Sequence, residues 1–131
     1  MSRNSNGPNV PAAIAAIERL RKTVAVLPEV VEKIDKFGHV AFRVRDKPFV
    51  MIGNGTGEGS LAIKADVHTQ RFLIEQRGFH RTPYIGQHGW TSVPRLPPED
   101  WDEVEGLVRE GYRLAAPSSL VRVLEADHGG A

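Results

Sequence analysis

The segment from Tyr84 to Trp90 holds the side chains of this chain that are best suited to chemistry. A histidine can act as a general base near neutral pH, so His88 and Tyr84 around the glycine turn form the best catalytic pair. Such a base needs a carboxylate to orient it, with His39 or His80 nearby, and the sequence identifies no such carboxylate. Histidines beside glycines are usually surface residues. An enzyme that uses His88 and Tyr84 is therefore the least favoured interpretation, and we assign no catalytic residue.

Metal and cofactor chemistry has weaker support. The absence of cysteine excludes disulfides, thiolate ligands and a cysteine nucleophile. His68, His80 and His88 lack the i, i+4 spacing of a zinc pair and have no acidic cluster beside them. The alternating glycines of residues 53–59 precede an expected strand and not a helix, so they indicate a flexible hairpin loop and not a phosphate-binding loop. We expect no metal and no cofactor.

The formal net charge of +1 hides an uneven distribution of charge along the chain. Residues 36–95 carry nine basic and four acidic side chains, whereas residues 96–131 carry three basic and eight acidic ones. A basic middle can meet a polyanion, and an acidic end argues against a chain built wholly for one. The alternative is that the two regions lie close together in the fold and neutralise each other.

A basic and aromatic face of a sheet is the candidate binding site. If Val40, Phe42 and Val44 face the helices, alternation sends their neighbours to the opposite face, where cations and an aromatic could follow phosphates and stack on unpaired bases. The opposing interpretation is that Trp90 packs within the fold and that the arginines are solvated or paired with carboxylates. The hypothetical nucleic-acid contacts are Arg43, Arg45, Lys47, Lys64, Arg81, Tyr84, His88 and Trp90.

The pattern of apolar residues predicts which elements would position these side chains. We expect helices at 10–26, 67–77 and 99–115, a short helical turn at 29–34 and a short helix from 117 onward. Asp66 is a natural N-cap and Gly78 a natural stop for the middle helix, whose Phe72 and Leu73 should face inward. The expected strands are 40–45, 48–52, 60–64, 80–84 and 90–95.

This order, α-βββ-α-ββ-α, predicts a two-layer α+β domain with a mainly antiparallel, five-stranded sheet and helices on one face. We expect a disordered tail at 1–9, a single domain at 10–125 and a flexible end at 126–131. The first residues lack the apolar region of a secretory signal, and no apolar run approaches the roughly 20 residues that span a bilayer. These features favour a cytoplasmic protein without a membrane partner.

Four segments in this order resemble the MmcQ/YjbR family of small bacterial proteins: Leu27–Glu32 leading to Phe42–Phe49, Leu61–Asp66, Tyr84–Val93, and Asp100–Trp101 through Gly111–Pro117. The resemblance implies a two-layer α/β fold similar in shape to secretion chaperones. It also implies the label DNA-binding, without a mechanism or an established activity. Family members often have a histidine directly before the tryptophan and a serine before the late tyrosine, where this chain has Gly89 and Gly111.

Two classes of function therefore remain. The first is weak, sequence-tolerant binding of DNA or another nucleic acid, since no helix-turn-helix pattern is present. The second is a protein-interaction or dimerisation module that docks another protein or a second copy of the chain on the open face or edge of the sheet, as the resemblance to secretion chaperones suggests.

Overall fold

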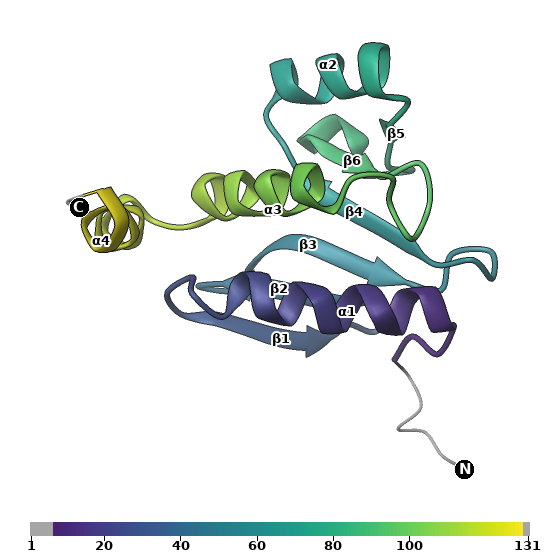
Figure 1. Ribbon diagram of the computed structural model, residues 1–131, viewed down its shortest axis with the longest axis horizontal. Coiled ribbons are helices and arrows are strands. Elements are labelled where there is room, and N and C mark those ends of the chain that lie inside the picture. Colours follow the sequence, from purple (N-terminus) through teal and green to yellow (C-terminus); the bar gives the residue numbers. More distant parts are fainter. Residues whose placement is uncertain (1–6, 130–131) are drawn as a thin grey trace.

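The computed structural model describes residues 7–129 and has an α+β architecture with one antiparallel sheet (Figure 1). The strand order is β1-β2-β3-β4-β6-β5. Residues 1–6 of the expected tail at 1–9, and residues 130–131 of the expected flexible end at 126–131, lie outside the described residues. Residues 126–129 belong to helix α4, which continues to Gly129. The elements are α1 (Pro11–Val24), β1 (Val30–Ile34), β2 (Val40–Val44), β3 (Lys47–Gly53), β4 (Ser60–Lys64), α2 (Val67–Arg77), β5 (His80–Arg81), the 3₁₀ helix η2 (Gly86–His88), β6 (Trp90–Ser92), α3 (Trp101–Ala115) and α4 (Ser118–Gly129).

The predicted class is confirmed, but the sheet has six strands instead of five. The segment 29–34, expected as a helical turn, is strand β1, which pairs antiparallel with β2 from Val30 opposite Val44 to Ile34 opposite Val40. β-Branched residues at Val30, Val31 and Ile34 suit an extended backbone, and pairing with β2 supplies the hydrogen bonds that a short isolated helix lacks. β1 is an edge strand and is mostly exposed.

Helices α1 and α3 lie side by side on one face of the sheet (Figure 1). The core between the two layers joins helix residues such as Leu20 and Val108 to the inward residues of the central strands. The pairing of β2 with β3 shifts register between Phe42 and Arg43, so that Phe49 is unpaired. This bulge lets Phe49 and the adjacent Val50 both lie in the core.

Helix α3 approaches the sheet very closely at Gly111. A β-carbon there would lie 2.9 Å from the Lys64 carbonyl oxygen and 3.2 Å from that of Phe49. The next residue, Tyr112, is fully buried and packs edge-on against Phe49, with 5.6 Å between the ring centroids. Its hydroxyl donates a hydrogen bond to the Pro28 carbonyl oxygen at 2.8 Å. The glycine therefore allows the close contact that the tyrosine secures.

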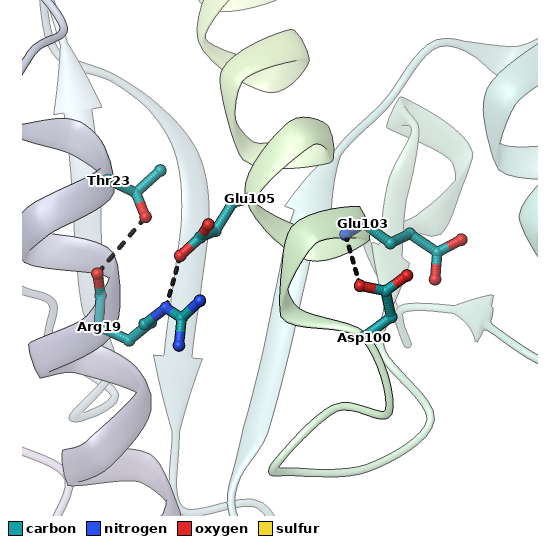
Figure 2. A network of polar contacts seen from close by, with 5 residues as sticks. All are labelled: Arg19, Thr23, Asp100, Glu103 and Glu105. Carbon is teal, nitrogen blue, oxygen red and sulfur yellow. Dashed lines mark hydrogen bonds and ion pairs between the residues drawn. The ribbon is translucent and has the colours of Figure 1, made fainter.

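Polar contacts connect the two helices of this layer and fix the start of α3 (Figure 2). The Arg19 guanidinium on α1 donates to the Glu105 carboxylate on α3 at 2.6 Å. Asp100 caps α3 by accepting a hydrogen bond from the Glu103 N–H at 3.2 Å. The Arg19–Glu105 pair therefore connects α1 to α3, and the Asp100 cap stabilises the first turn of α3.

The predicted bounds of α2 are confirmed. Asp66 accepts a hydrogen bond from the Thr69 N–H at 2.8 Å, and Gly78 ends the helix with a φ of 75°. Leu73 is buried as expected, but the expected burial of Phe72 is wrong, because 54 % of that residue is exposed. The helix buries only a narrow stripe, Gln70 and Leu73, so its other apolar side chains face outward.

The glycine-rich segment 53–59 is the β3–β4 hairpin loop, as predicted. Gly55, Gly57 and Gly59 all have positive φ, which glycine adopts without strain. The Asn54 side-chain oxygen accepts hydrogen bonds from the backbone N–H groups of Asn9 and Val10, just before α1. The loop therefore has a structural role at the start of the first helix.

Candidate nucleic-acid interface

The sheet has one face against the helices and an opposite face, which we call the open face. Alternation along the strands assigns residues to the two faces, because directly paired residues point to the same side. Ala41 and Ala62 are buried yet lie outside the core cluster, in agreement with their place on the open face. The paired strand residues on this face are Val31, Lys33, Ala41, Arg43, Pro48, Met51, Ala62, Lys64, Trp90, Ser92 and His80.

The charged side chains among these paired residues are all cationic. Lys33, Arg43 and Lys64 come from β1, β2 and β4, and no aspartate or glutamate accompanies them in the paired positions. None of the three forms an ion pair within 4 Å with another described residue. Arg43 is half-buried and donates to the Asp46 carbonyl oxygen at 2.9 Å, which leaves its charge uncompensated. The open face is therefore a positively charged surface.

Trp90 lies on this face but is not exposed. It pairs with Lys64, whose Nζ lies 6.0 Å from the centroid of the indole ring, and only 6 % of Trp90 is accessible. The expectation that Trp90 offers an exposed stacking platform is wrong. Alternation predicted the correct face, but it does not predict how far neighbouring side chains cover a residue there. Trp90 instead lies close to a cation that is attracted to its ring.

Arg45 lies in the β2–β3 turn and not on the open face, contrary to expectation. Its φ is 50° and that of Asp46 is 67°, as in a tight hairpin turn. The Arg45 guanidinium donates to both carboxylate oxygens of Glu29, at 2.6 and 3.1 Å. This hydrogen bond holds the pKa of the Glu29 carboxyl below its ordinary value. Lys47 is exposed and pairs with Val44, so it belongs to the strand residues that point to the helix-covered face of the sheet.

Arg81, Tyr84 and His88 are exposed and lie outside the paired open-face positions. Arg81 pairs with Thr91, on the opposite register from Trp90. Tyr84 is 94 % exposed at the centre of a three-residue turn, in which the Ile85 N–H donates to the Pro83 carbonyl oxygen at 2.8 Å. Its φ of 70° is that of a strained γ-turn.

The carboxylate that would have to orient His88 as a base is not found within ion-pair distance among the described residues. His88 ends η2 and makes no ion pair within 4 Å with a carboxylate of residues 7–129. Within the same residues, no three His, Asp or Glu side chains gather into a group that could hold a metal ion. No helix there has the length and apolar character needed to cross a bilayer.

A groove of about 350 Å³ adjoins the open face at Lys64. It lies between the start of α2, the η2 turn and the end of α3, and is lined by Lys64, Ala65, Asp66, Val67, Gln70, Gln87, His88, Gly89 and Leu114; we call it the α2 groove. The Asp66 carboxyl has a pKa below its ordinary value, chiefly because it accepts a hydrogen bond from the Thr69 N–H. It therefore stays charged near neutral pH.

The floor of the α2 groove is rigid. Gln70 is only 5 % exposed, and its side-chain NH₂ donates to the carbonyl oxygens of Gly86 and Trp90 at 2.9 and 3.0 Å. The Ala65 N–H donates to the Gly89 carbonyl oxygen at 3.0 Å, and a β-carbon at Gly89 would lie 2.0 Å from the Ala65 carbonyl oxygen. These contacts join α2, β4 and the η2 turn into one unit.

Sequence reasoning missed Lys33 and Gln70. Lys33 was hidden by the expected helical turn at 29–34. Gln70 could have been found, because it lies three residues before Leu73 on the inward stripe of a helix, where a polar residue needs a buried partner.

The basic middle of the chain remains largely unneutralised within the described residues. Arg77 pairs with Glu103 at 2.9 Å, and Arg45 pairs with Glu29. The other basic residues of 36–95 form no ion pair within 4 Å there: Lys36, Arg43, Lys47, Lys64, Arg71, Arg81 and Arg95. Among the described residues, the basic and acidic regions therefore share one ion pair, Arg77–Glu103.

The comparisons with known proteins identify a family without supplying an activity. No curated protein matches this chain. The family model described as YjbR matches residues 25–114, a span that includes all six strands, α2 and nearly all of α3. Because this match covers more than half of the sequence and agrees with the four segments that indicated the resemblance, the chain belongs to the YjbR family.

Proposed function

We propose that this protein binds nucleic acid weakly and with little sequence preference, through phosphate contacts on the open face. The observation that carries the proposal is that the charged side chains of the paired open-face residues, Lys33, Arg43 and Lys64, are all cationic and free of ion pairs among the described residues. Neighbouring strands are about 4.8 Å apart, so β1 and β4 are separated by roughly 14 Å. That distance corresponds to about four nucleotides of one strand, at a rise of 3.4 Å per nucleotide along the helix axis.

The burial of Trp90 makes this a phosphate-directed surface. A base cannot stack on an indole that is covered, so affinity should come from the release of counterions by the three cations. Three phosphate contacts predict that log K falls against log salt with a slope of about −2.7 on duplex DNA and about −2.1 on single strands. Binding of this kind is weak at physiological salt and tolerant of sequence.

Fluorescence anisotropy with labelled DNA at several salt concentrations tests the proposal. The triple variant K33A/R43A/K64A should lose most of its affinity and nearly all of the salt dependence. The matched control K22A/R71A/R122A removes the same charge from exposed positions on α1, α2 and α4. If both triple variants lose affinity equally, net charge and not the open face governs binding, and the proposal is refuted.

A protein-interaction module is the second candidate, because β1 leaves one edge of the sheet unpaired. Val31 and Ile34 on this edge are each about half exposed, and the strand pairs only with β2 within the described residues. An exposed edge can accept a strand from another protein or from a second copy. Sedimentation at increasing concentration, with a Val31→Lys variant for comparison, tests self-association. A monomer at every concentration would exclude the second copy.

A further inference from the structure

We infer that the α2 groove receives an unpaired base of the nucleic acid whose phosphates lie on the open face. This inference rests on the proposed function. Lys64 joins the two surfaces, because its strand register places it on the open face and it also lines the groove. The groove and the open face therefore share one residue, the last of β4.

Gln70 supplies a hydrogen-bond acceptor that has no partner. Its NH₂ group donates to two backbone carbonyls, which fixes the orientation of the side chain. Its oxygen has no hydrogen-bond partner among the described residues, although the residue is 95 % buried. Since no sealed side-chain oxygen or nitrogen of the described residues lacks a partner, this oxygen is accessible to solvent.

Gln70 lines two hollows, which share Val67. The smaller one has a volume of about 170 Å³, and Arg71 and Arg81 are among the residues that line it. The α2 groove has twice that volume and also contains Lys64 and His88. A volume of about 350 Å³ is at the lower end of the range for small-ligand pockets, roughly 300–1,000 Å³. We therefore assign the base to the α2 groove.

The charges of the groove select a base and not a phosphate as the group that enters. Asp66 is ionised and would repel a phosphate, whereas the edge of a base presents N–H donors to the Gln70 oxygen and to this carboxylate. The phosphate then remains beside Lys64. Every base carries at least one such donor, so this contact adds affinity for an unpaired nucleotide without strong sequence preference.

The walls of the groove suit a planar, largely apolar ring. Val67 and Leu114 are about half exposed and offer apolar contact on either side of the entrance, and His88 offers an imidazole face on which a base can stack. This gives His88 a binding role that requires no carboxylate partner.

A duplex with a single-nucleotide overhang tests the inference. One duplex ends in an unpaired thymidine and its matched control ends in an abasic tetrahydrofuran residue, with overhangs at either the 3′ or the 5′ end. Both carry the same phosphates, and only the first has a base for the groove. We expect the wild-type protein to bind the thymidine overhang about tenfold more tightly, in line with the contribution of one stacked base.

Two variants locate the effect. L114W should fill the groove and abolish the preference for the base while it leaves the salt-dependent affinity intact. V123W adds the same side chain at an exposed position of α4 and should leave the preference unchanged. Equal, salt-dependent binding of both duplexes by the wild type would overturn this inference and leave the proposed function standing. Failure to bind either duplex would refute both.

Discussion

Replacing Gly89 by alanine should destabilise the fold severely. Gly89 has a φ of 96°, and a β-carbon there would lie 2.0 Å from the Ala65 carbonyl oxygen, well inside the shortest separation that such atoms adopt. The contacting atom belongs to the backbone, so no side chain can rotate away. The segment must move, and the Ala65 N–H and Thr91 hydroxyl both donate to the Gly89 carbonyl oxygen at 3.0 Å.

The magnitude follows from these contacts. A non-glycine residue in this conformation costs about 1–2 kcal/mol. Displacing the segment weakens two hydrogen bonds worth about 1 kcal/mol each, and the Thr91 hydroxyl is buried, so leaving it unpaired adds to the loss. The expected total of roughly 3–5 kcal/mol is a large part of a typical stability of about 5–15 kcal/mol.

Gly78→Ala is the matched control. Gly78 also has positive φ, at 75°, but a β-carbon there meets no atom within 4 Å. It should lose only the backbone cost of about 1–2 kcal/mol. Urea unfolding measures the free energy of unfolding of both variants and of the wild type, and the dependence of that free energy on urea concentration should be the same for all three. If the two variants lose the same free energy, the close approach of Gly89 to Ala65 is not a feature of the folded protein and the reasoning fails.

Two further predictions concern α3 and α2. Gly106→Ala should stabilise the protein by about 0.5–1 kcal/mol, because Gly106 lies inside α3 and its β-carbon would meet no atom within 4 Å; a lower thermal midpoint would contradict this. Asp66→Asn keeps an oxygen that can cap α2 but removes the charge. The pKa of Asp66 is lower in the folded protein than its ordinary value near 4, so the charged carboxylate stabilises the fold at any pH above that ordinary value. This stabilisation is lost as the pH falls through the pKa of the folded state. The stability advantage of the wild type over this variant, measured by urea unfolding at pH 7, 5 and 3, should therefore shrink with falling pH, and a constant difference would argue against it.

Local chemistry made some elements predictable from the sequence. The bounds of α2 follow from Asp66 and Gly78, which act within one helical turn of the residues they cap. The hairpin loop at 53–59 follows from its glycines for the same reason. β1 was assigned wrongly because its strand conformation depends on pairing with β2, ten residues further along the chain, and Val30–Ile34 alone carries no comparable local signal.

The candidate site was predictable only in part. Alternation along β2 and β4 correctly placed Arg43 and Lys64 on one face, since this depends only on the geometry of a strand. Alternation says nothing about how far neighbouring side chains cover a residue, so it could not decide whether Trp90 is exposed or packs within the fold, as the structure shows it does. Arg45 was misplaced because the hairpin turn begins at that residue, so the alternation ends one residue earlier.

The two departures from the family pattern both occur where backbones approach closely. A serine at 111 would bring its β-carbon to 2.9 Å from the Lys64 carbonyl oxygen, and any side chain at 89 would collide with Ala65. Both positions lie next to the end of β4, the strand end that carries Lys64 and borders the α2 groove. At both positions the glycine allows a close approach of two backbone segments beside the end of β4.

The net charge of +1 is compatible with binding to a polyanion because the charges are separated by layer. Three acidic residues of α3 pair with helix cations: Glu103 with Arg77, Glu105 with Arg19 and Glu110 with Arg113. These carboxylates lie on the helix layer, about 10 Å from the mid-plane of the sheet, and the Debye length at physiological salt is about 8 Å. A phosphate on the open face thus experiences chiefly Lys33, Arg43 and Lys64. The salt dependence of binding should consequently follow three phosphate contacts, and removing acidic residues from α3 should raise affinity far less than removing one open-face cation lowers it.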